Sequence, residues 1–153
     1  VMENMSLKET GLVLQFHVVA MFLPSLITGN LIKKYGHSAI IYGGVLFFFI
    51  TVLISLFEQT YLNYMLSLIF LGLGWNFLFI SGTSLVVLTY NKEEKFKVQG
   101  INDLIVFSTM ALASLSAGIL LNSIGWKMMN IICIPFLVLI IFVSFMADKK
   151  SVS

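Results

Sequence analysis

The chain has 153 residues, of which 59% are hydrophobic and only 10% are charged, with a formal net charge of +2. Soluble domains carry about a quarter charged residues, so this composition excludes an ordinary soluble fold, and the small net charge provides no basic surface for nucleic acid. A single cysteine, Cys133, excludes an intrachain disulfide and a cysteine-rich metal site, and its apolar neighbours predict a buried packing residue.

Long apolar runs separated by short polar links divide the chain. They predict five membrane-spanning helices, at about residues 11–32, 39–57, 62–88, 101–121 and 129–147. The runs are too long for barrel strands and do not alternate polar with apolar residues. The predicted fold class is therefore an all-α integral membrane protein.

The lysines predict the orientation. With five spans, seven lysines fall on one face of the membrane and only Lys8 and Lys127 on the other. Because cytoplasmic loops are rich in Lys and Arg, the N-terminus is expected outside and the C-terminus in the cytoplasm. The seven are Lys33, Lys34, Lys92, Lys95, Lys97, Lys149 and Lys150.

The run 62–88 is expected to lie inside the helix bundle. Its middle contains Gly72, Gly74, Trp75 and Asn76, and an unpaired amide at mid-membrane would be costly. Small residues allow neighbouring helices to approach closely. By the same polar count, helices 11–32 and 101–121 are predicted to be interior, whereas 39–57 and 129–147 are predicted to face lipid. Pro24 is expected to kink the first helix.

Several polar residues are candidates for a substrate cavity. Asn76, Phe79 and Thr83 share one helical stripe with Trp75 beside it, and Gln15 and His17 lie in the outer half of the first helix. Asn76 would either contact substrate or make a hydrogen bond to a serine of a neighbouring helix. His17 would be a proton-coupling group, a substrate donor or a packing residue.

Asn102 and Asp103 are candidates for coupling or gating. An intramembrane carboxylate is a functional candidate by default. A structural role is equally open, because Asp103 is expected in the first turn of the fourth helix, where an acid favours the positive end of the helix dipole.

Catalytic motifs are not found in the sequence. It contains no nucleotide-binding loop, no nucleophile elbow and no paired histidines at helical spacing, and the two histidines are His17 and His37. We therefore expect no enzyme activity, no metal site and no cofactor.

The segment after the first helix, Gly29-Asn30-Leu31-Ile32-Lys33-Lys34-Tyr35-Gly36-His37, resembles a loop signature of the major facilitator superfamily, G-x-L-x-D-R-x-G-R. Gly29, Leu31 and Gly36 match, Lys34 keeps a positive charge, and Lys33 replaces the aspartate. The runs GLVLQFHVVAMFLPSLITG, GLGWNFLFISGTSL and VQGINDLIVFSTMALASLSAG extend the resemblance to a bacterial subgroup over nearly the whole chain.

This resemblance implies that residues 1–153 form part of the C-terminal half of a transporter, similar to its eighth to twelfth helices. The second to sixth helices of the first half are the alternative. It further implies alternating-access transport of a small molecule, possible proton coupling, and partnership with the remaining helices in a bacterial cytoplasmic membrane. Two other functions stay open: a non-transporting membrane subunit or scaffold, and a truncated, inactive fragment.

Overall fold

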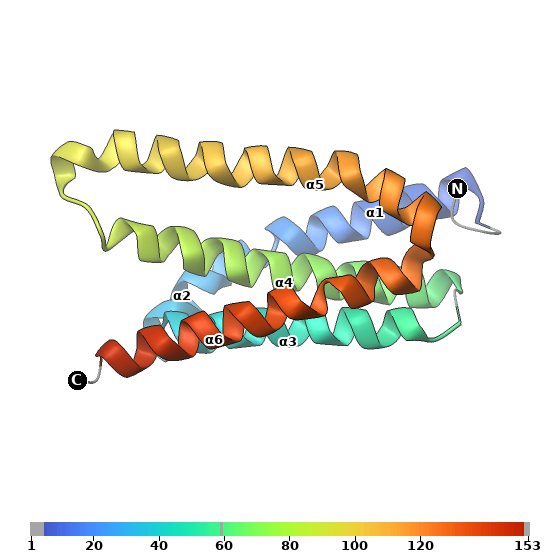
Figure 1. The fold of residues 1–153 in the computed structure, drawn as a ribbon, viewed down its shortest axis with the longest axis horizontal. Coiled ribbons are helices and arrows are strands. Elements are labelled where there is room, and N and C mark those ends of the chain that lie inside the picture. Colours follow the sequence, from blue (N-terminus) through green and yellow to red (C-terminus); the bar gives the residue numbers. More distant parts are fainter. Residues whose placement is uncertain (1–4, 59, 152–153) are drawn as a thin grey trace.

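The computed structural model describes residues 5–58 and 60–151, and the described part is all-helical (Figure 1). This confirms the predicted fold class. The α-helices are α1 (Leu7–Phe22), α2 (Ser25–Tyr35), α3 (His37–Leu56), α4 (Tyr61–Val87), α5 (Lys95–Ile132) and α6 (Ile134–Ser151), with one 3₁₀ turn, η1 (Lys92–Glu94).

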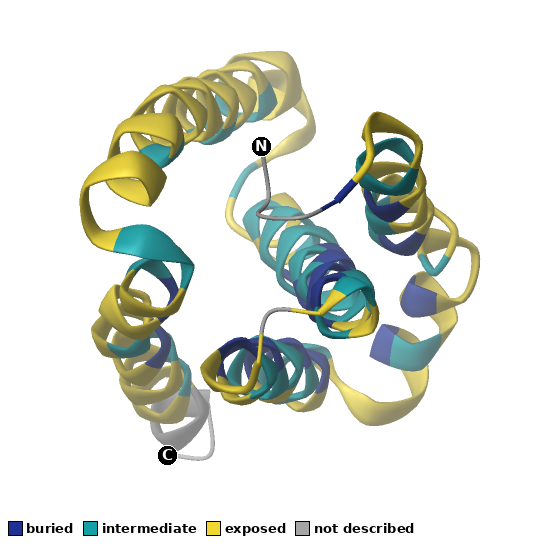
Figure 2. Ribbon diagram, turned by 90° about the vertical axis from the view of Figure 1, so that its right-hand side faces the viewer, coloured by how far each residue is buried: buried dark blue, intermediate teal, exposed yellow. Residues whose placement is uncertain are grey.

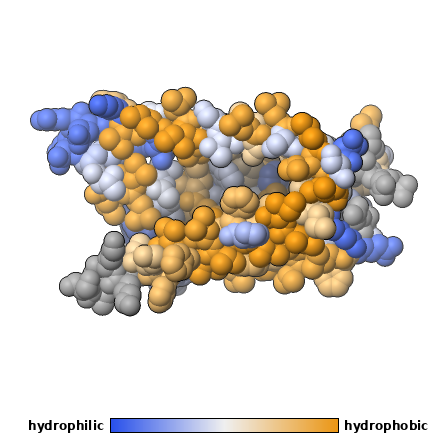
Figure 3. Space-filling model, in the orientation of Figure 1, coloured by the Kyte–Doolittle hydropathy of each residue, from blue (hydrophilic) through white to orange (hydrophobic). Residues whose placement is uncertain are grey.

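Within the described residues, four helical segments are long and apolar enough to cross a membrane. They are Leu7–Tyr35, His37–Leu56, Tyr61–Val87 and Lys92–Ala147, and the last, at 56 residues, turns back on itself and is long enough for two crossings. On the face shown in Figure 3, apolar residues form a broad band across the middle, with hydrophilic residues gathered toward the two ends. This distribution is that of a membrane-embedded bundle.

Where the sequence predicts one kinked helix at 11–32, the structure has two helices, α1 and α2, on either side of Pro24. Proline has no N–H to donate to the preceding turn, so the helical hydrogen-bond ladder is interrupted there. The N–H of Leu26 instead bonds to the carbonyl of Leu23 at 3.3 Å. The two helices still form one continuous span.

The helix α5 begins earlier than the sequence predicts. Residues 89–100 are expected to be a polar link, yet α5 starts at Lys95, because the Lys and Glu residues of this segment are good helix formers as well as polar. Asp103 therefore lies in the third turn of α5, and its expected place in the first turn is wrong. Near the other end, Gly125 (φ 74°) turns the chain toward α6, a left-handed conformation that glycine adopts without strain.

Two glycines of α4 allow close contacts with the helices on its opposite sides. A Cβ on Gly72 would lie 2.7 Å from the His17 carbonyl oxygen of α1. A Cβ on Gly74 would lie 2.9 Å from the Gly44 carbonyl oxygen of α3. α4 is thus packed between α1 and α3, and the expectation that its small residues permit close helix approach agrees with this geometry (Figure 2).

The predicted exposure of α3 and α5 is reversed in this chain, whereas α6 is mostly exposed, as predicted. α3, expected to face lipid, packs against α4 and contributes buried residues along its whole length, from Ile40 to Ser55. α5, expected to be interior, has one buried residue, Asn130, and is exposed over most of its surface (Figure 2). Cys133, expected to be buried, is exposed. The number of polar residues in a helix therefore does not indicate whether that helix is buried within these 153 residues.

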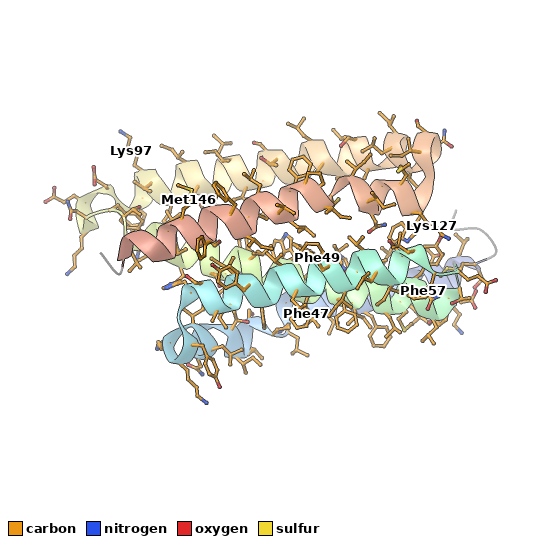
Figure 4. All side chains as sticks on the ribbon, turned by 60° about the horizontal axis from the view of Figure 1, so that its bottom comes forward. Phe47, Phe49, Phe57, Lys97, Lys127 and Met146 are labelled. Carbon is orange, nitrogen blue, oxygen red and sulfur yellow. The ribbon has the colours of Figure 1, made fainter. Side chains whose placement is uncertain are left out.

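Most lysine-bearing segments lie at the same end of the bundle. The α2–α3 turn, the segment from η1 to the start of α5, and the end of α6 lie at one end, whereas α1 begins at the other (Figure 1). Lys97 and Lys127 lie at opposite ends (Figure 4). At the end where α1 begins, Trp126 packs edge-on against Tyr64 with ring centroids 5.3 Å apart.

Candidate functional site

The amide of Asn76 is at the centre of a fully buried polar cluster between α4 and the first span. Asn76 is 1% exposed and Thr28 is 0% exposed. The Asn76 Nδ2 donates to the carbonyl oxygen of Met21 at 2.7 Å, and the Thr28 Oγ1 donates to the Asn76 Oδ1 at 2.7 Å. One side chain of α4 therefore contacts both α1 and α2. The sequence-based alternative of an interhelical hydrogen bond has this geometry, with a threonine where a serine was expected.

The partners determine which way the amide points. The Met21 carbonyl can only accept, so the nitrogen of the amide must face it and the oxygen must face the Thr28 hydroxyl. A reversed amide would place two oxygens in contact. The Thr28 hydroxyl also lies 2.8 Å from the carbonyl oxygen of Pro24, so its hydrogen is shared between two acceptors.

An aromatic surface lies beside this cluster. Trp75 and Phe79 stack with ring centroids 4.6 Å apart and an interplanar angle of 12°, and Phe22 meets Trp75 edge-on at 6.1 Å. Trp75 and Phe79 are half-buried, and Phe22 is 59% exposed. The three rings from α1 and α4 are called the aromatic surface below.

His17 contacts α4 as well. Its Nδ1 lies 2.7 Å from the carbonyl oxygen of Leu68, and because a carbonyl only accepts, Nδ1 carries the proton of the neutral ring. In this neutral tautomer, Nε2 has a lone pair that can accept a hydrogen bond. Of the other cavity candidates, Gln15 is exposed on α1 and Thr83 is half-buried on α4.

Asn102 and Asp103 lie apart from this group, on α5. Asp103 is exposed, and the Asn102 Nδ2 donates to its Oδ1 at 3.2 Å. Within the described residues, no hydrogen bond joins either side chain to Asn76, Thr28 or His17.

The signature residues Gly29, Leu31, Lys33, Lys34 and Gly36 lie on α2 and in the turn that follows it. Gly36 has φ 84°, and its N–H bonds to the Ile32 carbonyl at 2.8 Å, so it closes α2 in a conformation suited to glycine. Directly after it, the His37 Nε2 lies 3.0 Å from the Ser84 Oγ and links the start of α3 to the end of α4.

Three partners of Asn76 and Trp75 were not among the sequence-based site candidates: Met21, Phe22 and Thr28. A backbone carbonyl has no sequence signal of its own. Pro24, however, indicates where carbonyls lose their donors, and Thr28 follows it by one helical turn. This spacing, combined with the amide on the central helix, was the available signal.

A bundle of apolar spans with hydrogen-bonded polar groups enclosed near its middle defines a multi-pass membrane protein with an interior polar layer. The family model of the Major Facilitator Superfamily matches residues 1–153, and the chain belongs to this family. This confirms the resemblance drawn from the signature segment.

Two relatives agree with this family. The chain is 40% identical over 136 residues to the riboflavin transporter RfnT of Brucella anthropi, a match covering 89% of this chain and 34% of that protein. It is 31% identical over 128 residues to the uncharacterized MFS-type transporter YdeG of Bacillus subtilis, covering 82% of this chain and 30% of that protein. The chain thus spans about a third of the length of these relatives. No solved structure matches the chain significantly.

Proposed function

We propose that this chain is part of a secondary transporter that moves a flavin-like solute across a bacterial cytoplasmic membrane by alternating access. The observation that carries the proposal is the 40% identity to a riboflavin transporter over 89% of the chain. The segment corresponds to the eighth to twelfth helices of a twelve-helix protein, and the remaining helices complete the substrate cavity.

The aromatic surface suits a flat conjugated ring. Trp75 and Phe79 have nearly parallel rings, and such rings bind other flat π-systems by offset stacking. The tricyclic ring of a flavin has large apolar faces and a polar edge of carbonyl and N–H groups. Trp75 lies near the middle of α4, at the depth where transporters of this kind bind their substrates.

The polar edge of such a solute needs hydrogen-bonding partners next to the stacking surface. His17 offers the Nε2 lone pair, since its Nδ1 is committed to Leu68. Gln15 and Thr83 supply an amide and a hydroxyl from the same two helices. Asp103 is the proposed proton-coupling or gating group, with Asn102 hydrogen-bonded to it.

The lysine-rich end of the bundle is proposed to face the cytoplasm. Lys33, Lys34, Lys92, Lys95 and Lys97 all belong to that end, and cytoplasmic loops carry such an excess. The N-terminal side of α1 then faces outward.

Transport of labelled riboflavin by the complete gene product tests this function. Expressed in a bacterium lacking its own riboflavin transport, it should change flavin accumulation, and a protonophore should abolish the change. Lumichrome, which keeps the ring system without the sugar chain, should compete, whereas ribitol should not. Absence of flavin movement in right-side-out and inverted vesicles, with normal protein levels, would overturn the proposed substrate.

The aromatic surface needs its own variants. Trp75→Ala should raise the apparent KM for riboflavin about tenfold, the size of one lost stacking contact. Trp75→Phe should keep most of the affinity, because it retains a flat ring. An exposed aromatic residue at the lysine-rich end, Phe96 (86% exposed), supplies the matched control as Phe96→Ala. Equal effects of Trp75→Ala and Phe96→Ala would contradict the assignment.

A further inference from the structure

The break at Pro24 leaves carbonyl groups in the membrane interior that the backbone does not satisfy. Two of them receive side-chain donors: the Ser25 Oγ donates to the Phe22 carbonyl at 2.6 Å, and the Asn76 Nδ2 donates to the Met21 carbonyl at 2.7 Å. Lipid supplies no hydrogen-bond donors, so freed carbonyls in a span must be satisfied within the protein. Serine does this locally, whereas Asn76 does it from another helix.

Asn76 contacts both sides of the break. Met21 belongs to the last turn of α1, and Thr28 belongs to the first turn of α2. The two hydrogen bonds, each 2.7 Å long, use the donor and the acceptor end of one amide. If the angle between α1 and α2 changed, the two distances could not both be kept, because the amide is rigid and its own helix is packed between α1 and α3.

We infer that Asn76 and Thr28 form a clasp that sets the angle between α1 and α2, and that Asn76 is a positioning residue and not a substrate ligand. Its 1% exposure leaves no surface for a solute, and both ends of its amide are engaged by the protein. Thr28, at 0% exposure, is equally closed to solute.

The clasp also determines where Phe22 lies. Phe22 follows Met21 directly, and its ring meets Trp75, the neighbour of Asn76, at 6.1 Å. Fixing the end of α1 against Asn76 therefore fixes the edge of the aromatic surface. This last step rests on the proposed function, since it makes the clasp a determinant of substrate affinity. The clasp itself does not.

Spin labels on either side of the break measure the angle directly. They are placed at Leu14 on α1 (50% exposed) and at Asn30 on α2, which is also exposed, in the complete gene product in lipid nanodiscs, with Cys133 replaced by serine. Thr28→Val removes the hydroxyl at nearly constant volume. It should lower the ratio of molecules at the wild-type label distance to molecules at other distances about fivefold, the effect of one buried hydrogen bond.

Two variants control this measurement. Thr28→Ser keeps the hydroxyl and should retain the wild-type distance. Thr109→Val makes the same substitution on α5, where the hydroxyl bonds only within its own helix, to the Ile105 carbonyl at 2.8 Å, and it should leave the distance unchanged. An unchanged distance distribution in Thr28→Val, or an equal change in Thr109→Val, would overturn the clasp.

A double-mutant cycle separates positioning from direct substrate binding. Pro24→Ala restores a backbone N–H and allows a continuous helix in which the N–H of Ser25 can satisfy Met21. If Asn76 acts through the break, Asn76→Leu should raise the KM for riboflavin several-fold when Pro24 is present. In the Pro24→Ala background the increase should be much smaller. A KM increase of the same size in both backgrounds would show direct binding and overturn the inference. If the wild-type protein moves no riboflavin, the proposed function fails, whereas the label distances still decide the clasp.

Discussion

The two parts of this bundle use their polar side chains in different ways. In α1–α4, polar side chains reach across helices: His17 to Leu68, Thr28 to Asn76, and Thr51 to the Ser67 carbonyl at 3.2 Å. In α5, hydroxyls bond back to their own helix, as Thr109 does to Ile105 and Ser123 to Ile119. Helices α1–α4 are therefore held together by specific hydrogen bonds between helices. The hydroxyls named for α5 bond within α5 itself, and most of the α5 surface is exposed.

This difference explains why a count of polar residues gave the wrong exposure for α3 and α5. The hydroxyls of Thr109, Ser116 and Ser123 in α5 are bonded to carbonyls one turn back, so they are compatible with either lipid or a neighbouring helix. α3 has few polar residues, yet it packs closely because Gly44 meets α4. Close packing in membranes depends on small residues as much as on polar ones.

The largest contrast is expected between two glycines. In Gly72→Ala, the new Cβ would lie 2.7 Å from the His17 carbonyl oxygen and 2.9 Å from the Ala20 Cβ, so α1 must move away. We expect a loss of about 3 kcal/mol or more, as for severe overpacking. In Gly118→Ala, no atom of the described residues lies within 4 Å of the new Cβ, and the helix should gain up to about 1 kcal/mol. Thermal unfolding of the purified complete gene product measures both, and equal stabilities would remove the distinction between α4 and α5.

The next contrast concerns function. Asp103→Asn keeps the volume of the side chain and removes its charge, while Asn102 can still hydrogen-bond to it. If Asp103 transfers a proton, the transport rate should fall about 100-fold, with a smaller change in KM. Asn102→Ala should have a weaker effect because the carboxylate remains. Rate and KM measured across a range of pH values test this, and a change in KM alone would assign Asp103 to binding.

A smaller effect is expected from a pair of threonines. Thr51→Val removes a buried hydroxyl that lies 3.2 Å from the Ser67 carbonyl of α4 and 3.1 Å from the Phe47 carbonyl of its own helix. We expect a loss of about 1 kcal/mol, whereas Thr109→Val on α5 should change stability by less than about 0.5 kcal/mol. Chemical or thermal unfolding resolves the two. A cost at Thr109 as large as at Thr51 would mean that α5 is packed as specifically as α3.

The smallest effect is expected at the lysine-rich end, where substitutions should leave stability unchanged. Lys34→Cys on α2 and Lys95→Cys on α5, with Cys133→Ser, should both resist an impermeant thiol reagent applied to intact cells and react in inverted vesicles. Labelling of either position from outside would contradict the proposed orientation. Labelling of only one would show that the two parts do not share a cytoplasmic end.

The sequence predicted the bundle but not all of its contacts. Hydropathy indicates the spans because a helix in lipid needs about 20 apolar residues, and Pro24 indicates the break because it lacks a donor. Asn76 was recognised as an interior polar group. Its partners were not, since one is a main-chain carbonyl and the other, Thr28, resembles any hydroxyl in a span. The start of α5 was missed because charged residues that form helices well also resemble a loop.

The length of α5 has a consequence for the membrane around it. From Lys95 to the turn at Gly125 the helix has 30 residues and is about 45 Å long, whereas the hydrocarbon layer is about 30 Å thick. The extra length of the helix is accommodated by tilt or by several residues emerging among the lipid headgroups. Lys95 and Lys97 favour emergence at their end, where their ammonium groups can reach phosphates. Asp103, about 12 Å along the helix axis from Lys95, then lies near the boundary where water penetrates. Bilayer thickness thereby becomes a variable that sets the hydration of this carboxylate.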